Sequence, residues 1–396
     1  MGRRLIAAAV LLVIGGVALA YGFTQLMTPE TGWQTIEANT AQGPSCGDEL
    51  VFRYELGADG ASPGTENRAV SALYSDACRT LYQLFHATEG FEGITNLREL
   101  SLHPNETLTV DATLYGALEA VQRHGDRTIY LGPVYDRYNG LFPCQDDVQR
   151  WEFDPRLNPD VAREYETLAT YARNPESIDL RLLGNNQVCL HVSEDYLAFA
   201  QREGVEWFLD FGWLKNAFVV DALAELLIEN GFTHGVLSSY DGFQRNLDSR
   251  ETDYGLNVLD YGDGALYPAA VLSYRGPRSM VCLRDFAVEE LDWQRICRLE
   301  SGGTRTAYLS PEDGLCRSAV RSLIGYSERV GCGEIALGLA PVYVAEELEP
   351  GALDGLAREG IQSIYCRDRV IYATEPGVNL TNLYEGGGVR YTLARK

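Results

Sequence analysis

The stretch from Asp210 to Gly231 reads DFGWLKNAFVVDALAELLIENG and contains the clearest structural signal in the chain. Its second half, from Asp221 to Asn230, has apolar residues at helical spacing and stops at a glycine, a residue that commonly ends helices. An aspartate in front of such a run can accept hydrogen bonds from free backbone amides, so Asp221 is predicted to be the N-cap. Residues 235–239 then follow the pattern of a strand. The stretch therefore predicts a loop, a helix and a strand, in that order.

Strands and long helices are predicted on both sides of this stretch. Strand patterns occupy residues 51–56, 187–192, 267–273, 306–309, 361–365 and 370–373, and helical patterns occupy 67–86 and 109–122, the second with Asp111 as its cap. Residues 143–175 are polar and interrupted by prolines, which predicts an irregular or partly helical insertion. Helices do not alternate strictly with strands, so the predicted class is α+β, with a largely antiparallel sheet in one body of two lobes.

The N-terminus carries a candidate membrane segment over residues 1–27. Arg3 and Arg4 precede an uncharged apolar run from Leu5 to Phe23, which as a helix would rise about 28 Å, close to the roughly 30 Å of a hydrocarbon core. By the positive-inside rule, this predicts a single signal anchor in the cell membrane with an extracytoplasmic body. The alternative is a signal peptide cleaved near Ala20, after small residues, which would leave a secreted protein.

Two further segments follow the candidate anchor. Residues 28–48 are rich in Thr, Gly, Pro and Gln, a composition typical of an extracytoplasmic linker. The folded domain is therefore predicted to span residues 49–396.

The charge of the chain excludes some classes of partner. It has 56 acidic and 33 basic residues and a net charge of −23, which would repel nucleic acids and anionic lipid surfaces. No nucleic-acid partner is expected, and contact with the membrane is expected through the N-terminal segment only. The nine cysteines show neither a Cys-x-x-Cys pair nor zinc-site spacing, and their number is odd, so their pairing stays open.

The quoted stretch resembles the FAD:protein FMN transferases, the ApbE-type flavin transferases. Their pattern, Asp-x-Gly-Gly-Ile-Ala-Lys-Gly-Tyr-Ala-x-Asp before a helix that ends in Gly, fits this stretch without a gap. Asp210, Gly212 and Asp221 match in identity, and Phe218 replaces the aromatic Tyr. Further landmarks occur in the family's order at Cys46-Gly47-Asp48, Gly93 to Leu97, Val110-Asp111 and Gly132-Pro133-Val134, so the resemblance covers about residues 47–372. It implies an ApbE-like, T-fold-related body of two lobes.

The resemblance also implies a reaction. In that family FAD and Mg²⁺ bind in a cleft, and FMN is transferred from FAD to a Thr or Ser hydroxyl of a target protein. The expected partner is then a Thr- or Ser-bearing acceptor protein of an envelope electron-transfer system. Such phosphoryl transfer requires a metal to neutralise the diphosphate and a group that activates the hydroxyl.

Several residues depart from the family's pattern. The family's Lys falls on Asn216, and Lys215 stands where the family has the Ala whose carbonyl helps to hold the metal. One hypothesis is that the ammonium of Lys215 replaces magnesium as a fixed charge; the alternative is a solvated turn residue. The Asn-x-Gly-Gly-Asp motif falls on Ser238 to Gly242, where Asp241 is displaced by one position and Tyr240 occupies a glycine position.

Two more motifs are only partly retained. Ser279 and Arg284 are the first and last residues of the Ser-Gly-x-Tyr-x-Arg segment, and the metal motif Ala-Asp-Ala-Leu-Ser-Thr falls on Gly333 to Gly338, where Glu334 offers a carboxylate. The resemblance thus implies catalytic roles for Asp241 and Glu334, metal binding by Glu334, and cofactor binding by Asp210, Gly212, Lys215, Asn216, Phe218, Asp221, Ser279 and Arg284. The structural alternatives are a turn role for Asp210, a core role for Phe218 and a solvated face for Glu334.

Two functions stay open. The first is a working transferase that uses Glu334 and Asp241 in place of the usual acids. The second is a scaffold or binding protein of the cell envelope that keeps the fold without FAD chemistry. Because at least four site motifs are altered together, the sequence favours the second.

Overall fold

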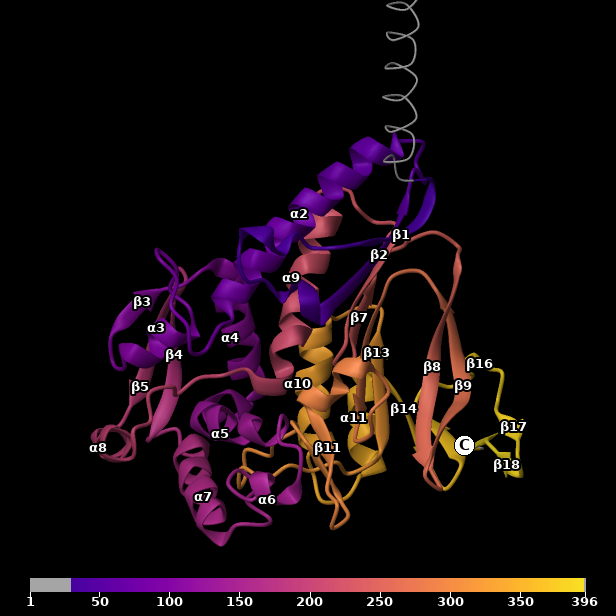
Figure 1. Ribbon diagram of the computed structural model, residues 1–396. Coiled ribbons are helices and arrows are strands. Elements are labelled where there is room, and N and C mark those ends of the chain that lie inside the picture. Colours follow the sequence, from indigo (N-terminus) through magenta and orange to yellow (C-terminus); the bar gives the residue numbers. More distant parts are fainter. Residues whose placement is uncertain (1–29, 395–396) are drawn as a thin grey trace, which may run out of the picture.

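The computed structural model describes residues 30–394, which are built around a nine-stranded sheet (Figure 1). Its strands, in spatial order, are β1 (Gly32–Ile36), β2 (Leu50–Leu56), β6 (Gly235–Ser239), β7 (Phe243–Asn246), β10 (Arg278–Arg284), β13 (Ser322–Ser327), β14 (Gln362–Arg367), β15 (Val370–Ala373) and β19 (Thr392–Leu393). All neighbours are antiparallel except the last pair. The predicted α+β class with a largely antiparallel sheet is therefore confirmed.

Helices cover one face of this sheet (Figure 1). They are α2 (Pro63–Leu84), α9 (Lys215–Glu229), α10 (Cys332–Tyr343) and α11 (Pro350–Arg358), with α4 (Ala112–His124) packed against α10. The contact between α10 and β13 is close: a Cβ placed on Gly325 would lie 2.5 Å from Leu339 and 2.7 Å from Ile335. Only glycine therefore allows this helix to approach the sheet so closely.

A smaller sheet covers the other face. Its strands are β8 (Asp253–Gly262), β9 (Ala265–Arg275) and β16 (Leu380–Thr381). Met280, Ile324 and Ile364 of the main sheet and Val258 and Leu272 of the smaller one form a second core between the two layers. The central strands are buried on both faces, which explains why β13 is apolar or small along its whole length.

The second lobe packs beside the helical layer and includes β3 (Thr107–Thr109), β4 (Ile178–Gly184) and β5 (Gln187–Val192). Its helices are α3 (Leu97–Leu102), α5 (Gly132–Tyr138), α6 (Asp147–Arg150), α7 (Pro159–Arg173) and α8 (Glu194–Glu203). The short elements that remain are β11 (Ile296–Arg298), β12 (Thr304–Thr306), β17 (Glu385–Gly386), β18 (Val389–Arg390), η1 (Thr40–Gln42), η2 (Cys46–Glu49), η3 (Thr128–Leu131), η4 (Asn139–Leu141), η5 (Gly212–Leu214) and η6 (Glu290–Gln294). The segment 143–175, expected to be irregular or partly helical, is partly helical: it contains α6 and α7, with irregular chain before and between them.

The N-terminal part of the described chain differs from the expected linker over residues 28–48. Gly32–Ile36 pairs with β2 as an edge strand of the main sheet, and Cys46 is buried. The ring of Trp33 lies 6.4 Å from that of Tyr254 and 5.8 Å from the guanidinium of Arg53. The partly exposed Trp33 and the buried Ile36 thus attach this segment to the folded body. The predicted anchor and its cleavage site lie outside the described residues, and within residues 30–394 no helix combines the length and the apolar character needed to cross a bilayer.

Two other expectations were wrong. The strand expected over 306–309 is confined to β12, which ends at Thr306, and beyond it Leu309 makes only an isolated bridge to Cys316. Helix α9 begins at Lys215 rather than after Asp221, because the residues between them, including Phe218, are apolar and buried in the core. Asp221 is consequently inside the helix and is not its N-cap.

Candidate functional site

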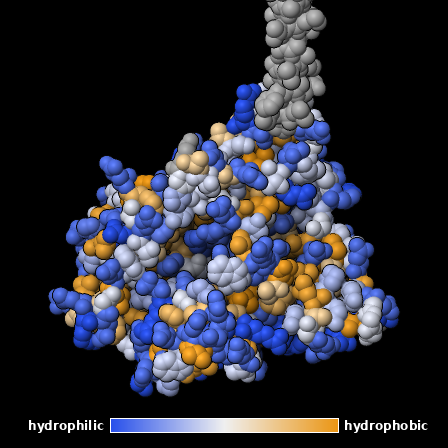
Figure 2. Space-filling view, in the orientation of Figure 1, coloured by the Kyte–Doolittle hydropathy of each residue, from blue (hydrophilic) through white to orange (hydrophobic). Residues whose placement is uncertain are grey.

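A polar cleft opens where α9 begins, beside the turn that follows β6 and the segment from η6 to β11. Its cavity has a volume of about 250 Å³. Five of the predicted site residues line it: Asp210, Gly212, Lys215, Asn216 and Asp241. Glu49, Trp213, Tyr240, Arg295 and Tyr308 also contribute to its wall. Figure 2 shows the molecular surface hollowed near the centre of this face.

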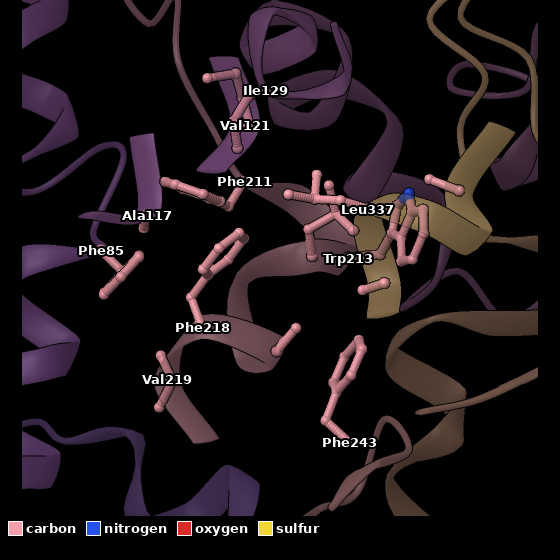
Figure 3. Close-up of a cluster of buried hydrophobic side chains, with 14 of the residues drawn as sticks. Phe85, Ala117, Val121, Ile129, Phe211, Trp213, Phe218, Val219, Phe243 and Leu337 are labelled. Atoms are coloured by element: carbon pink, nitrogen blue, oxygen red, sulfur yellow. The ribbon is translucent and has the colours of Figure 1, made fainter. Parts of the chain in front are cut away.

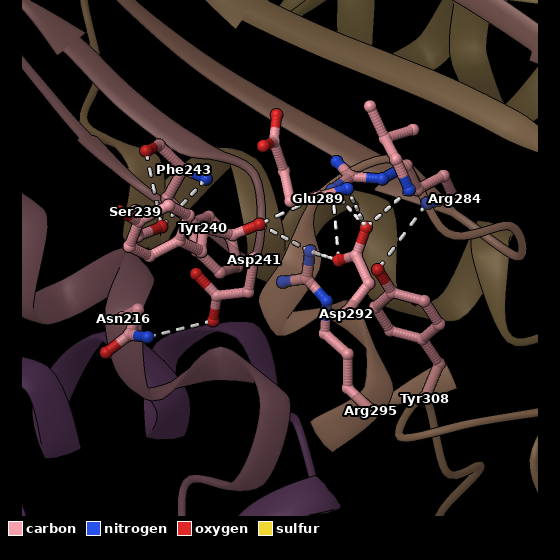
Figure 4. Close-up of polar contacts among 11 residues, drawn as sticks. Asn216, Ser239, Tyr240, Asp241, Phe243, Arg284, Glu289, Asp292, Arg295 and Tyr308 are labelled. Atoms are coloured by element: carbon pink, nitrogen blue, oxygen red, sulfur yellow. Dashed lines mark hydrogen bonds and ion pairs between the residues drawn. The ribbon is translucent and has the colours of Figure 1, made fainter. Parts of the chain in front are cut away.

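An amide links two carboxylates inside the cleft. The Nδ2 of Asn216 lies 2.9 Å from Oε2 of Glu49 and 3.0 Å from Oδ2 of Asp241, the second contact being drawn in Figure 4. The Nζ of Lys215 lies 2.9 Å from Oε1 of Glu49. The first two residues of α9 therefore hold one acid from η2 and one from the turn after β6.

Glu49 was missed by reasoning from sequence. It lies at the junction of η2 and β2, and its carbonyl accepts a hydrogen bond of 3.1 Å from the backbone amide of Tyr240. This position depends on the antiparallel pairing of β2 with β6, which places Leu50 opposite Ser239. The only sequence feature that bears on the position of Glu49 is the pair of strand patterns that become β2 and β6. The register in which they pair cannot be deduced from either strand alone.

The electrostatics of this group favour charged side chains. Burial opposes ionisation of Glu49, but the Lys215 ammonium and the hydrogen bonds from Lys215 and Asn216 outweigh it and lower the pKa of Glu49. Burial likewise opposes the charge on Lys215, yet the Glu49 carboxylate raises the pKa of Lys215 above its ordinary value. The two side chains thus form an ion pair across the neutral range.

This ion pair predicts a pH dependence that a Glu49→Gln variant would reveal. Because the pKa of Glu49 is lower in the folded state than its ordinary value of 4.5, its stabilisation is complete above that value and is lost as the pH falls through the lower folded value. The difference in unfolding free energy between wild type and Glu49→Gln should therefore shrink below about pH 4.5. Chemical denaturation at a series of pH values measures it, and a difference independent of pH would contradict the ion pair.

Asp210 and Gly212 form the tight turn that enters α9. Oδ1 of Asp210 accepts a hydrogen bond of 2.7 Å from the amide of Gly212, and burial raises the pKa of Asp210 despite that bond. Gly212 has φ = 52°, and a Cβ there would lie 2.3 Å from the ring of Tyr135. Glycine is thus required at position 212 because a larger residue would collide with the ring of Tyr135. Asp210 lines the cleft while it shapes this turn.

A buried ion cluster fixes the turn that carries Asp241. Asp292 is fully buried and accepts hydrogen bonds from Arg284 and Arg295, and from the backbone amides of Val288 at 2.6 Å and Glu289 at 2.8 Å. Both guanidiniums also donate to the carbonyl of Tyr240 (Figure 4). Arg284, predicted to bind a cofactor, is therefore committed to Asp292 and Tyr240 and does not line the cleft.

Three solved structures share this arrangement of elements. The ApbE protein of Thermotoga maritima aligns over 85% of this chain and 94% of its own with a TM-score of 0.56 and 12% identity. The flavin transferase ApbE of Vibrio cholerae aligns over 86% and 95% with a TM-score of 0.55 and 13% identity. The apo flavinyl transferase ApbE of Pseudomonas stutzeri aligns over 87% and 95% with a TM-score of 0.54 and 11% identity. The chain has the ApbE flavin-transferase fold. No protein-family model and no curated protein matches its sequence.

Besides Arg284, four of the predicted site residues lie away from the cleft of this ApbE-fold body. Phe218 is buried in an apolar cluster, 5.0 Å from the ring of Phe211 (Figure 3). Ser279 is buried within β10, between β7 and β13. Asp221 accepts hydrogen bonds of 2.8 Å from the amides of Cys332 and Gly333. It caps α10 instead of its own helix.

The fourth is Glu334, predicted to be a catalytic residue and a metal ligand. Its carboxylate lies 2.7 Å from Nε2 of His124 and 2.8 Å from Nη2 of Arg123, at the C-terminal end of α4. Glu334 joins α10 to α4, and it is not among the residues that line the cleft.

Replacing Glu334 by alanine should therefore have small effects. Since the pairs are partly exposed, the expected loss of unfolding free energy is below about 1 kcal/mol. Ligand binding in the cleft should not change. Thermal unfolding and a binding titration measure both quantities, and loss of binding in a well-folded Glu334→Ala protein would restore the predicted site role.

The donor set of the cleft does not fit a magnesium ion. Within residues 30–394 no group of three or more His, Cys, Asp or Glu side chains is arranged to hold a metal. Glu49 and Asp241 are bridged by the Asn216 amide, and Glu49 is also neutralised by Lys215. Magnesium requires near-octahedral oxygen ligands, and this arrangement supplies nitrogen donors between the two acids.

The cleft nevertheless has the character of a binding site. Five buried polar atoms of its lining residues lack a hydrogen-bond partner: Oδ1 of Asp241, Oδ1 of Asn216, Nε1 of Trp213, Nε of Arg295 and the hydroxyl of Tyr135. Buried polar atoms are almost always satisfied, so a ligand or ordered water is expected to contact them. The volume of about 250 Å³ is below the roughly 300–1,000 Å³ typical of pockets for drug-sized ligands, so the cleft can enclose only part of a dinucleotide.

Proposed function

We propose that this protein is a divergent member of the FAD:protein FMN transferase family that binds part of a flavin nucleotide in its cleft without transferring FMN. The observation that carries the proposal is the set of five unsatisfied buried polar atoms among the residues that line the cleft of an ApbE-fold body. Asp241 and Asn216 offer acceptors, whereas Trp213, Tyr135 and Arg295 offer donors. Such a mixed set can hold the polar edge of a heteroaromatic ring or a hydroxylated chain.

Magnesium-dependent transfer is not supported by the same residues. A diphosphate needs cations, and the cleft is lined by three acids, Glu49, Asp210 and Asp241, against two bases, Lys215 and Arg295. At the family's metal motif, Glu334 is bound to α4, and a Cβ on Gly338 would meet Leu356 of α11 at 3.1 Å. We therefore derive no step through a metal.

Lys215 is the cleft's candidate substitute for a metal charge. Its side chain is 30% exposed, so the ammonium remains reachable while it pairs with Glu49. A ligand phosphate that approached it would compete with the Glu49 carboxylate for the same N–H donors. The hypothesis predicts ligand binding that does not require magnesium.

A working transferase is the second candidate. It is favoured by one observation: Asp241 lines the cleft and its buried Oδ1 has no hydrogen-bond partner, so this carboxylate could accept the proton of a Thr or Ser hydroxyl. The acceptor would then be an envelope electron-transfer protein that bears such a residue. Glu334 would have no part in this version.

Titration of the full-length protein in detergent with FAD and with FMN, each with and without magnesium, separates the two candidates. We expect saturable binding that is independent of magnesium, that weakens in Trp213→Phe, and that is unchanged in Glu334→Ala. A second arm incubates the protein with FAD, magnesium and a Thr-bearing acceptor, and weighs the acceptor by mass spectrometry. An acceptor heavier by one FMN would establish the transferase, and no flavin binding in any arm would refute both candidates.

We further propose that the body is held outside the cytoplasm by the apolar segment that ends at Phe23. The support is the charge-free run behind Arg3 and Arg4. Fractionation of cells tests this: an anchored protein stays with membranes after alkaline extraction, whereas cleavage near Ala20 releases it. Protease added to cells with a permeable outer layer should digest the body if it lies outside the membrane.

A further inference from the structure

A second cavity, separate from the cleft, lies at the ends of two β-hairpins. Its volume is about 580 Å³, and it shares no lining residue with the cleft. It is bounded by the turn between β8 and β9, by β11, by the loop before β13 and by the turn between β14 and β15. The turn at the lower end of β8 and β9 is visible in Figure 1. Four arginines line this cavity: Arg298, Arg321, Arg367 and Arg369.

Three of these arginines have no carboxylate partner. Within residues 30–394 most arginines form ion pairs, but Arg298, Arg321 and Arg367 have no carboxylate oxygen within 4 Å; of the three, Arg321 has a longer-range electrostatic interaction with the carboxyl of Asp285. The guanidinium of Arg321 lies 5.5 Å from the ring centre of Tyr261, which holds it by a cation–π contact. Exposed guanidiniums with free N–H groups therefore converge on one cavity from three different segments.

The acidic residues of the cavity do not cancel this charge. It is lined by three aspartates against four arginines, a local excess of one positive charge on a chain whose net charge is −23. Asp263 is paired with Arg369, and Asp260 is buried, accepting hydrogen bonds from the Tyr391 hydroxyl at 3.0 Å and the Tyr261 amide at 2.9 Å. Of the three, Asp368 alone remains without a partner in the described chain.

The two hairpin turns hold the cavity in shape. Each is a two-residue turn with both residues at positive φ: Asp263 and Gly264 at 51° and 81°, and Asp368 and Arg369 at 52° and 63°. Such turns favour Asn, Asp or Gly, so an arginine at the second position is conformationally unfavourable. The ion pair from Arg369 to Asp263 ties the turns together. Local strain of this kind is concentrated at ligand sites, where it fixes geometry.

We propose that this cavity binds a small ligand that carries two or more oxyanion charges on phosphate or carboxylate groups. The planar fork of a guanidinium matches both groups in a bidentate manner, and three unpaired forks from separate elements suit a multivalent anion better than a single charge. The rings of Tyr261, Tyr267 and Tyr391 complete the wall, and the hydroxyls of Tyr261 and Tyr267 add donors of their own, whereas that of Tyr391 already donates to Asp260. The site does not depend on the function proposed for the cleft.

Calorimetric titration of the full-length protein with inorganic pyrophosphate and, separately, with citrate tests this site. At least one of the two anions is expected to bind saturably at one site per chain, more weakly at high salt. An Arg298→Gln/Arg367→Gln double variant should bind that anion at least about tenfold more weakly, because two charge-assisted contacts are lost. Arg181→Gln is the matched control, since Arg181 is exposed on β4, outside the cavity, and has no ion pair within the described chain.

The two titrations also identify which anionic group the site binds. Binding of pyrophosphate alone assigns the site to phosphate groups, and binding of citrate alone assigns it to carboxylates. Absence of saturable binding in both arms, or equal affinity in the double variant and in Arg181→Gln, would overturn the proposal. Unchanged thermal unfolding of the double variant would show that a lost signal reflects lost contacts and not lost structure.

Discussion

Asp292→Ala is expected to lower the free energy of unfolding by about 3–5 kcal/mol, one of the two largest effects of a single substitution that we predict. The carboxylate is fully buried, and it neutralises two guanidiniums that are themselves only 11% and 13% exposed. Removing it leaves Arg284 and Arg295 charged without an acid partner, and the amides of Val288 and Glu289 without an acceptor. Equilibrium denaturation measures the loss.

A matched control isolates the effect of burial. Asp76 pairs with Arg79 at 2.7 Å on α2, where the aspartate side chain is 68% exposed, so Asp76→Ala should cost less than about 1 kcal/mol. Because Arg284 and Arg295 also hold the Tyr240 carbonyl, Asp292→Ala should disturb the turn that carries Asp241 and weaken ligand binding in the cleft. If the two variants were equally stable, the buried ion cluster would have no structural importance.

Asp221→Ala is expected to lower the free energy of unfolding by about 2–4 kcal/mol, since it removes a helix cap and leaves buried donors unsatisfied. The carboxylate accepts hydrogen bonds from the first two amides of α10 and pairs with Arg245 at 2.8 Å. A Cβ on Gly331 would lie 2.3 Å from Oδ2 of Asp221, so the carboxylate occupies the space beside the start of α10. Asp221→Asn, which keeps one acceptor oxygen, should lose less.

The same variants distinguish a structural role from a cofactor role. Asp221 does not line the cleft, so at temperatures where the variant is folded the flavin affinity of Asp221→Asn should equal that of wild type. Denaturation provides the stability and a fluorescence titration provides the affinity. A stable Asp221→Asn protein with abolished flavin binding would instead support the cofactor role that the resemblance implies.

The fold was largely accessible from the sequence because its signals are local. The alternating pattern of 187–192 and 370–373 matches β5 and β15 to the residue, and Asp111 caps α4 by accepting from the amide of Thr113. Strand β1 was missed because its contacts are distant: Trp33 packs on Tyr254, more than two hundred positions away. The start of α9 was misplaced because the burial of 215–220 depends on the tertiary core and not on helical periodicity.

The candidate site was predictable only in part, for a related reason. Asn216 and Asp241 were identified through a motif order, and they do meet at 3.0 Å. Glu49, Asp292 and Arg295 complete their surroundings, but they belong to no recognisable pattern and are assembled by strand pairing and by η6. Glu334 occupies a position of the metal motif, but its carboxylate pairs with Arg123 and His124 of α4. These partners could not be predicted from the motif.

If the proposed anchor holds the protein at a membrane, the early start of the main sheet limits how far Gly32 can lie from the bilayer. With an anchor that ends at Phe23 and β1 beginning at Gly32, eight residues lie between the two, which makes nine steps along the chain of at most about 3.3–3.6 Å each. The tether is then no longer than roughly 30 Å, about the thickness of the hydrocarbon core itself. Gly32 would then lie within about one bilayer thickness of the membrane, so partners bound to the same membrane would meet this edge of the sheet more often than freely diffusing ones.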